Sequence, residues 1–139
     1  MENDDLVDLF GKTARRLRRD QMERLAPLGL TPSLARALRA IVRAEAPLRM
    51  TDLATRLGVV PRSATGLVDS LEEAGLVSRS PDPSNRRSIL VSPTDKGRTM
   101  RTLMGQARRE AAEDLFSALS PEQRESLRAL LAALNDPDA

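Results

Sequence analysis

The sequence contains no cysteine, histidine, tryptophan or tyrosine, and only two phenylalanines, Phe10 and Phe116. Without cysteine and histidine the chain cannot form disulfides, Cys/His zinc sites or thiol redox sensors, and no imidazole is present to act as a catalytic base. Serine-hydrolase triads and cysteine nucleophiles are excluded for the same reason. Because single-stranded nucleic acids are bound largely by stacking bases on aromatic rings, that class of binding module is disfavoured too. We therefore expect no enzyme activity, no metal and no cofactor.

Long hydrophobic runs are also missing. No apolar stretch approaches the roughly 20 residues needed to cross a bilayer, and residues 1–20 do not have the pattern of a signal peptide. The 139 residues, 40% apolar and 30% charged, fit one globular domain with its own core. The expectation from composition is a cytoplasmic protein with no membrane partner.

The net charge is only +2, but the charges are unevenly distributed. Residues 49–101 hold nine Lys and Arg against six Asp and Glu, whereas residues 102–139 hold four against seven. A basic centre is consistent with a nucleic-acid surface, although the asymmetry alone is a weak signal.

Proline, glycine and hydroxyl-bearing residues divide the first half of the chain into four predicted helices. The first runs from about residue 3 to 25 and ends at Pro27. The second has Thr31 as its cap, with proline in its first turn, and ends before Pro47. Both carry apolar residues at helical spacing, so each is expected to pack with one face.

The third and fourth predicted helices are close together, as in a helix-turn-helix. Thr51 is expected to cap a short helix that ends at Gly58, and Val59 and Val60 form the turn. The following helix begins with proline and spans about 61–74, with Gly75 as its left-handed stop.

Two short runs of β-forming residues follow, at 76–80 and 88–92, separated by the turn-rich segment 81–87. They predict a hairpin whose loop is longer than a two-residue turn and carries Arg86 and Arg87 at a projecting tip. Two helices complete the chain, the first capped by Thr94 and the second started by the capping box Ser-Pro-Glu-Gln at 120–123. The predicted fold is mainly α with a small β-wing, a winged helix-turn-helix with flanking N- and C-terminal helices in the order α-α-α-α-β-β-α-α.

In a helix-turn-helix the second helix enters the major groove of DNA and presents polar side chains to base edges. The expected DNA contacts are Pro61, Arg62, Ser63, Thr65, Gly66 and Asp69 on the outer face of 61–74, together with Thr51 on the preceding helix. An arginine can read guanine, hydroxyls can meet bases or phosphates, and glycine allows close approach. Taken alone, the same pattern also fits an ordinary amphipathic helix with a solvated outer face.

The hairpin favours the DNA interpretation. Arg86 and Arg87 match a wing that reaches a narrow minor groove, where the negative potential attracts arginine. Two loop arginines in isolation could equally be solvated. The runner-up function is a winged helix that serves as a protein-interaction module without operator binding, and a wing without arginines would favour it.

From Leu53 to Gly97 the sequence resembles the MarR family of bacterial and archaeal regulators. Residues 68–79 read Val-Asp-Ser-Leu-Glu-Glu-Ala-Gly-Leu-Val-Ser-Arg, which is moderately specific. The wing Asp-Pro-Ser-Asn-Arg-Arg at 82–87, followed by Val-Ser-Pro-Thr-Asp-Lys-Gly at 91–97, is more specific. One departure is Val60, where the family often has a serine that caps the recognition helix.

The resemblance implies a homodimer on a pseudo-palindromic operator of double-stranded DNA, usually a repressor that a small anionic or aromatic effector releases. It assigns dimerisation to 1–30 and 99–139, and DNA binding to 31–98, with the recognition helix at about 61–74 and the wing at about 76–92, all within one structural domain. The leucines of 127–134 independently support dimerisation by the C-terminal helices, because they present more apolar surface than the small central unit can bury.

Overall fold

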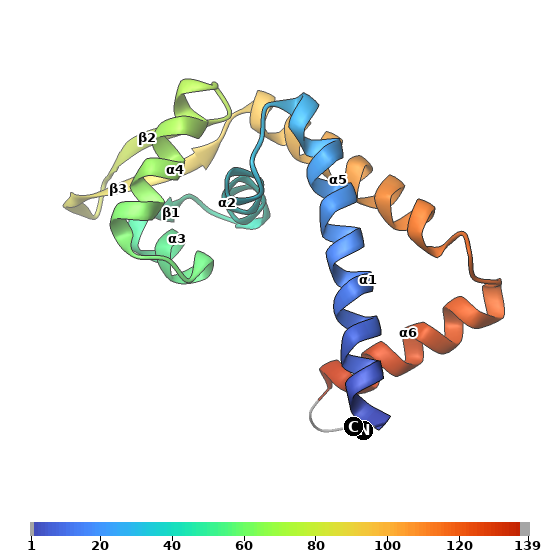
Figure 1. The fold of residues 1–139 in the computed structure, drawn as a ribbon. Helices are drawn as coiled ribbons and strands as arrows, with labels where there is room; N and C mark the ends of the chain where they lie inside the picture. Colours follow the sequence, from blue (N-terminus) through green and yellow to red (C-terminus); the bar gives the residue numbers. More distant parts are fainter. Residues whose placement is uncertain (1, 137–139) are drawn as a thin grey trace.

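The computed structural model describes residues 2–136 as an elongated, mainly helical molecule with a three-stranded antiparallel sheet (Figure 1). The elements in chain order are α1 Glu2–Leu25, η1 Ala26–Leu28, α2 Pro32–Arg43, β1 Leu48–Arg49, α3 Met50–Leu57, α4 Pro61–Glu73, β2 Val77–Asp82, β3 Asn85–Pro93, α5 Asp95–Phe116 and α6 Pro121–Asn135. The strand order in the sheet is β1-β3-β2. The predicted fold class, mainly α with a small β-wing, is confirmed.

The main core lies where α2, α3 and α4 pack against the sheet and the first half of α5. Its fully buried large side chains come from all of these elements: Leu38, Ile41, Leu53, Val68, Leu71, Val91 and Met104. Each such side chain contributes about 1.5–3 kcal/mol through burial. This core holds the helix-turn-helix and the base of the wing in one rigid unit, while α1, α5 and α6 extend away from it (Figure 1).

The predicted helix starts and stops are largely confirmed. The Thr31 side chain accepts a hydrogen bond from the backbone of Leu34, and Thr94 accepts one from Gly97, at 3.2 and 3.0 Å. Both halves of the capping box at the start of α6 are formed. Gly58 and Gly75 have φ of 66° and 77°, the left-handed conformation that ends a helix at little cost for glycine.

The prediction that Thr51 caps α3 is wrong. Helix α3 begins at Met50, and its cap position is Arg49, two residues earlier than predicted; the Arg49 side chain makes no capping hydrogen bond. The reason is a third strand that the sequence did not predict: β1 pairs with β3, with Leu48 opposite Val91, and leads directly into α3. Two residues are too few to produce a recognisable alternation of polar and apolar side chains.

The predicted hairpin is confirmed, with Val77–Pro81 paired to Ile89–Pro93, but its terminal turn is shorter than predicted. Strands β2 and β3 extend to Asp82 and from Asn85, which leaves a two-residue turn at Pro83 and Ser84. The Asp82 carboxylate accepts hydrogen bonds from the Ser84 backbone and hydroxyl, at 2.9 and 2.8 Å, and this local bridge tightens the turn. Regular pairing of the two strands ends at Pro81 and Ile89, so Arg86 and Arg87 lie in an irregular segment of β3 at the tip of the wing.

Helix α1 packs along α5, and Arg24 joins them through ion pairs to Glu110 and Asp114. The first half of α1 leaves apolar side chains uncovered, since Leu6 and Phe10 are mostly exposed. Within residues 2–136, no helix combines the length and the apolar character that a membrane crossing needs.

Candidate nucleic-acid interface

Helix α4 is fixed by its inner face, so that its outer face is presented to solvent. Ala64, Val68 and Leu71 are fully buried against the core. In the turn before α4, the backbone N–H of Val59 donates to the carbonyl of Ala54 at 3.1 Å. Val60 stands at the cap position and makes no side-chain capping bond, as its apolar side chain predicts. Pro61 has no backbone N–H, and the N–H groups of Ser63 and Ala64 donate to the carbonyl of Val60. The backbone N–H of Arg62 is thus the donor left at the N-terminus of α4 for an anion such as a phosphate.

The structure brings the predicted residues of α4 together on this outer face. All six are exposed: Pro61, Arg62, Ser63, Thr65, Gly66 and Asp69. Thr51 is exposed on α3. The Arg62 guanidinium makes no hydrogen bond or ion pair within the described residues, so its donors are free. The Thr65 hydroxyl donates to the carbonyl of Pro61 at 3.0 Å, which leaves its oxygen able to accept.

Gly66 is not required by packing. No heavy atom lies within 4 Å of the position that a Cβ would occupy there, and the backbone is helical. Glycine in a helix interior costs about 1 kcal/mol relative to alanine. A smooth surface at this point is useful when another molecule approaches the helix closely, which is the role that the sequence predicted.

Asp69 is held by a residue that the sequence analysis missed. Arg79 on β2 forms ion pairs with Asp69 and Glu72 of α4, the latter at 3.0 Å, and also donates toward the carbonyl of Thr65. Burial lowers the pKa of Arg79, but its hydrogen bonds to the two carboxylates outweigh this and raise the pKa above the ordinary value. The arrangement ties α4 to strand β2 of the wing. In the sequence, Arg79 is the arginine of the Leu-Val-Ser-Arg stretch at 76–79, and this motif was the signal that could have identified it.

The tip of the wing is fixed by a buried carboxylate. Asp82 is only 7% exposed, and its second oxygen accepts a hydrogen bond from Arg49 Nε at 3.0 Å. Hydrogen bonds from the Ser84 backbone and hydroxyl, with the charge of Arg49, lower the pKa of Asp82 below its ordinary value. Because Arg49 belongs to β1, this group joins the tip of the wing to the start of α3.

We expect the substitution Asp82→Asn to lower the melting temperature at neutral pH. A carboxyl group with a lowered folded-state pKa stabilises the fold above about pH 4 and loses this effect as the pH falls through the folded pKa. The difference between wild type and variant should therefore shrink in acid, as measured by thermal unfolding from pH 7 to pH 3. Glu45→Gln, which removes an exposed carboxylate, is the control at neutral pH. A constant difference at all pH values would contradict the assignment.

Arg86 and Arg87 project from the wing without partners. Both are exposed, and neither guanidinium forms a hydrogen bond or ion pair with another described residue. The backbone of Arg87 is fixed by its hydrogen bond to Asn85 Oδ1 at 3.1 Å. Within residues 2–136, no group of three or more acidic side chains is arranged to hold a metal ion.

Comparison with known proteins agrees with this geometry. The model of the MarR family matches residues 30–89, which contain the helix-turn-helix and most of the wing. The HTH-type transcriptional regulator YcgE of Bacillus subtilis is 31% identical over 114 residues, 82% of this chain and 66% of the relative. The chain is a member of the MarR family. A second B. subtilis regulator, YfiV, is 32% identical over 63% of this chain and 55% of its own length.

Solved MarR-family structures share nearly the whole fold. MarR of E. coli without ligand is 26% identical, with a TM-score of 0.82 over 93% of this chain and 95% of that chain. A cysteine-to-serine variant of E. coli MarR in complex with operator DNA is 26% identical, with a TM-score of 0.73 over 96% and 95% of the two chains. The curated relatives are longer, and this chain spans 55–66% of the length of YcgE and YfiV. Membership in a family of transcriptional regulators confirms the prediction that the chain is not an enzyme.

Proposed function

We propose that this chain is a transcriptional regulator that binds double-stranded operator DNA as a homodimer. The observation that carries the proposal is the presence of exposed, unpaired arginines on both the polar helix and the wing: Arg62 on α4, and Arg86 and Arg87 on β3. Arginine without a protein partner is the residue type expected at guanine edges, phosphates and narrow minor grooves. The structure of a similar protein, E. coli MarR, in complex with operator DNA supports DNA binding.

The proposed DNA contacts are those predicted from the sequence. Helix α4 enters the major groove with Pro61, Arg62, Ser63, Thr65, Gly66 and Asp69, while Thr51 faces the backbone and Arg86 and Arg87 reach the minor groove. Asp69 combines this role with its ion pair to Arg79. In this proposal the protein acts in the cytoplasm as a repressor, and a small-molecule effector releases it from DNA. Residues 31–98 form the proposed DNA-binding region.

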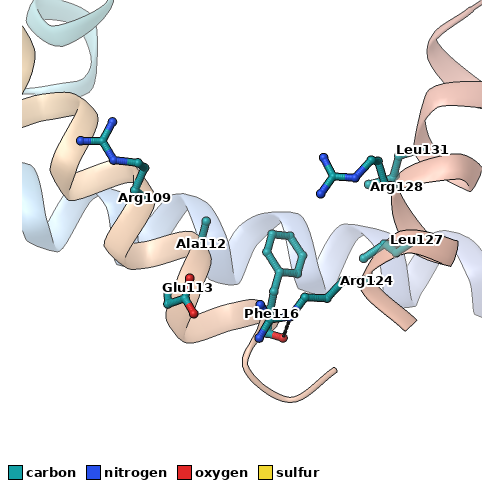
Figure 2. A pocket seen from close by; sticks show the side chains of 8 residues that line it. All are labelled: Arg109, Ala112, Glu113, Phe116, Arg124, Leu127, Arg128 and Leu131. Atoms are coloured by element: carbon teal, nitrogen blue, oxygen red, sulfur yellow. Dashed lines mark hydrogen bonds between the residues drawn. The ribbon is translucent and has the colours of Figure 1, made fainter. Parts of the chain in front are cut away.

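The homodimer is supported by apolar surface that one chain leaves uncovered. Leu6 and Phe10 on α1 are 64% and 58% exposed, and Leu130 and Leu134 on α6 are 65% and 76% exposed. Between α5 and α6 lies a groove of about 480 Å³ that includes Phe116, Leu127 and Leu131 (Figure 2). Exposed apolar surface of this kind marks interaction sites. The helices of a second copy would cover it and place the two recognition helices about one DNA turn (~34 Å) apart.

Replacing Leu130 and Leu131 together with aspartate should convert the dimer to a monomer. Two charges would have to be buried without partners in the apolar contact, which is strongly unfavourable. Light scattering coupled to size-exclusion chromatography measures the result. The matched control is Ala129→Asp with Ala132→Asp, which puts the same charge on the opposite, exposed face of α6. A Leu130→Asp, Leu131→Asp variant that stays dimeric would overturn the assignment of α6.

The function itself is tested by selecting genomic DNA fragments with the purified protein and titrating salt on the best site. We expect a short inverted repeat bound with a Kd in roughly the nanomolar range. Affinity should fall by about 10³-fold or more between 50 and 200 mM salt, because bound phosphates release their counterions. Weak binding with no sequence preference would contradict the proposal and favour a protein-interaction module.

A further inference from the structure

The residue before α4 departs from a pattern that this chain uses at two other helices. Helices α2, α4 and α6 all begin with proline. The cap residues of α2 and α6 are Thr31 and Ser120, and their hydroxyl oxygens accept hydrogen bonds from backbone N–H groups of the first turn. Val60 has the same position before α4, and its side chain makes no capping hydrogen bond. Helix α4 therefore lacks a cap that α2 and α6 have.

The backbone at Val60 does not require a valine. Its φ and ψ of −69° and 151° are close to the −86° and 163° of Thr31, so both residues have the extended geometry of a cap. A hydroxyl at this position stabilises a helix relative to an apolar side chain. A serine or threonine would therefore fit without strain and make α4 more stable. The valine is present at a cost to the stability of the helix.

Core packing does not explain the valine either. Val59, the preceding residue, is half-buried and packs against the hydrophobic core. Val60 is 65% exposed. A single exposed apolar side chain is ordinary on a protein surface, but this one also replaces a cap. It lies beside Pro61, Arg62 and Ser63, which are all exposed at the start of α4. A contact outside the chain is the remaining use for its two methyl groups.

We propose that Val60 is a specificity-determining residue that recognises the C5-methyl group of a thymine in the major groove. That methyl is the apolar group which base pairs present there, and apolar side chains contact it. The first residues of a recognition helix are those that reach base edges. A valine is restricted in χ1, so its side chain loses little conformational freedom in the contact.

The neighbouring Arg62 determines where this thymine should lie. Its guanidinium has no partner within residues 2–136, and arginine reads the O6 and N7 atoms of guanine. Since Val60 and Arg62 are two residues apart at the same helix end, the recognised thymine should lie next to a guanine, or one base pair further, in each half-site. The inference thus deepens the proposed operator binding, on which it rests, by adding a methyl contact to a polar one.

The test uses the full chain and the operator recovered by genomic selection. Each thymine is replaced in turn by deoxyuridine, symmetrically in both half-sites. Uracil pairs as thymine does and lacks only the methyl group. At one thymine of each half-site the substitution should weaken binding by about 15-fold, because each lost methyl contact is worth about fourfold in affinity. Fluorescence anisotropy at constant salt measures the Kd values.

Two variants separate the methyl contact from a structural role. Val60→Ser should bind the thymine and uracil operators equally, and its melting temperature should rise by about 3 °C because α4 gains a cap. Arg62→Ala is the matched control at the same helix end. It should weaken binding to both operators and keep the 15-fold ratio between them, because it leaves Val60 in place.

Three results would overturn the inference. One is a specific operator that binds equally with thymine or uracil at every position. Another is discrimination that persists in Val60→Ser, which would mean that a different side chain contacts the methyl group. The third is a melting temperature of Val60→Ser below that of wild type, which would show that the valine serves the fold. Failure to recover any specific operator would refute the proposed function as well, whereas these three results leave that function intact.

Discussion

Replacing Arg86 and Arg87 with alanine is expected to weaken operator binding by about 100-fold or more while leaving the melting temperature unchanged. A well-placed arginine contact to DNA is worth about 1–3 kcal/mol, and the proposed dimer loses two such residues from each wing. Stability should not change, because both side chains are exposed and their guanidinium groups have no partners among the described residues. The Asn85 hydrogen bond that fixes the hairpin uses the backbone of Arg87 and survives the substitution.

The measurement is a fluorescence-anisotropy titration of operator DNA at several salt concentrations. The slope of log Kd against log salt should decrease by roughly one for each phosphate contact that is lost. Arg15→Ala with Arg16→Ala removes the same charge from α1, far from the wing in Figure 1, and should have a much smaller effect. Equal losses in the two double variants would show that only net charge matters, and the wing assignment would then be wrong.

Local chemistry explains why much of the fold was predictable from the sequence. The caps at Thr31 and Thr94 act over three residues, and the stops at Gly58 and Gly75 depend on one backbone conformation. Such signals are complete within a short window, so they are visible in a linear sequence. The exposed face of α4 was predictable for the same reason, since helical periodicity alone separates its buried and exposed positions.

The missed features depend on contacts between distant residues. Arg49 and Asp82 are 33 residues apart, and nothing near either residue indicates that they pair. The short strand β1 exists only because β3 offers it backbone partners. Arg39 on α2 is affected by the positive charges of Arg101 and Arg108 on α5, although α3, α4 and the wing lie between the two helices in the sequence. In each case the tertiary fold creates the interaction, so the sequence supplies the residues but not their proximity.

Gly97 belongs to the segment that carries the sequence resemblance, and the structure shows why a glycine is needed there. It lies in the first turn of α5, where Thr94 donates from its backbone to the carbonyl of Leu76 and from its hydroxyl to the carbonyl of Gly75. Lys96 Nζ donates to the carbonyl of Ala74 at 2.8 Å. These bonds hold the start of α5 against residues 74–76, which follow α4. A Cβ at Gly97 would overlap the carbonyl oxygen of Leu76 and lie 3.0 Å from its carbonyl carbon.

Gly97→Ala should therefore destabilise the protein by about 3 kcal/mol or more and lower the melting temperature by about 10 °C. The obstacle is backbone, which cannot move aside as a flexible side chain would, so α5 must shift away from residues 74–76. Gly66→Ala is the matched control, because nothing lies within 4 Å of its Cβ position. That change should stabilise the fold by up to about 1 kcal/mol and still weaken operator binding, since it adds a methyl group to the proposed DNA-facing surface. Thermal unfolding and operator titration on both variants separate the packing requirement at Gly97 from the proposed DNA-facing role of Gly66. A Gly97→Ala variant as stable as wild type would show that the close approach of α5 to Leu76 is not required by the fold.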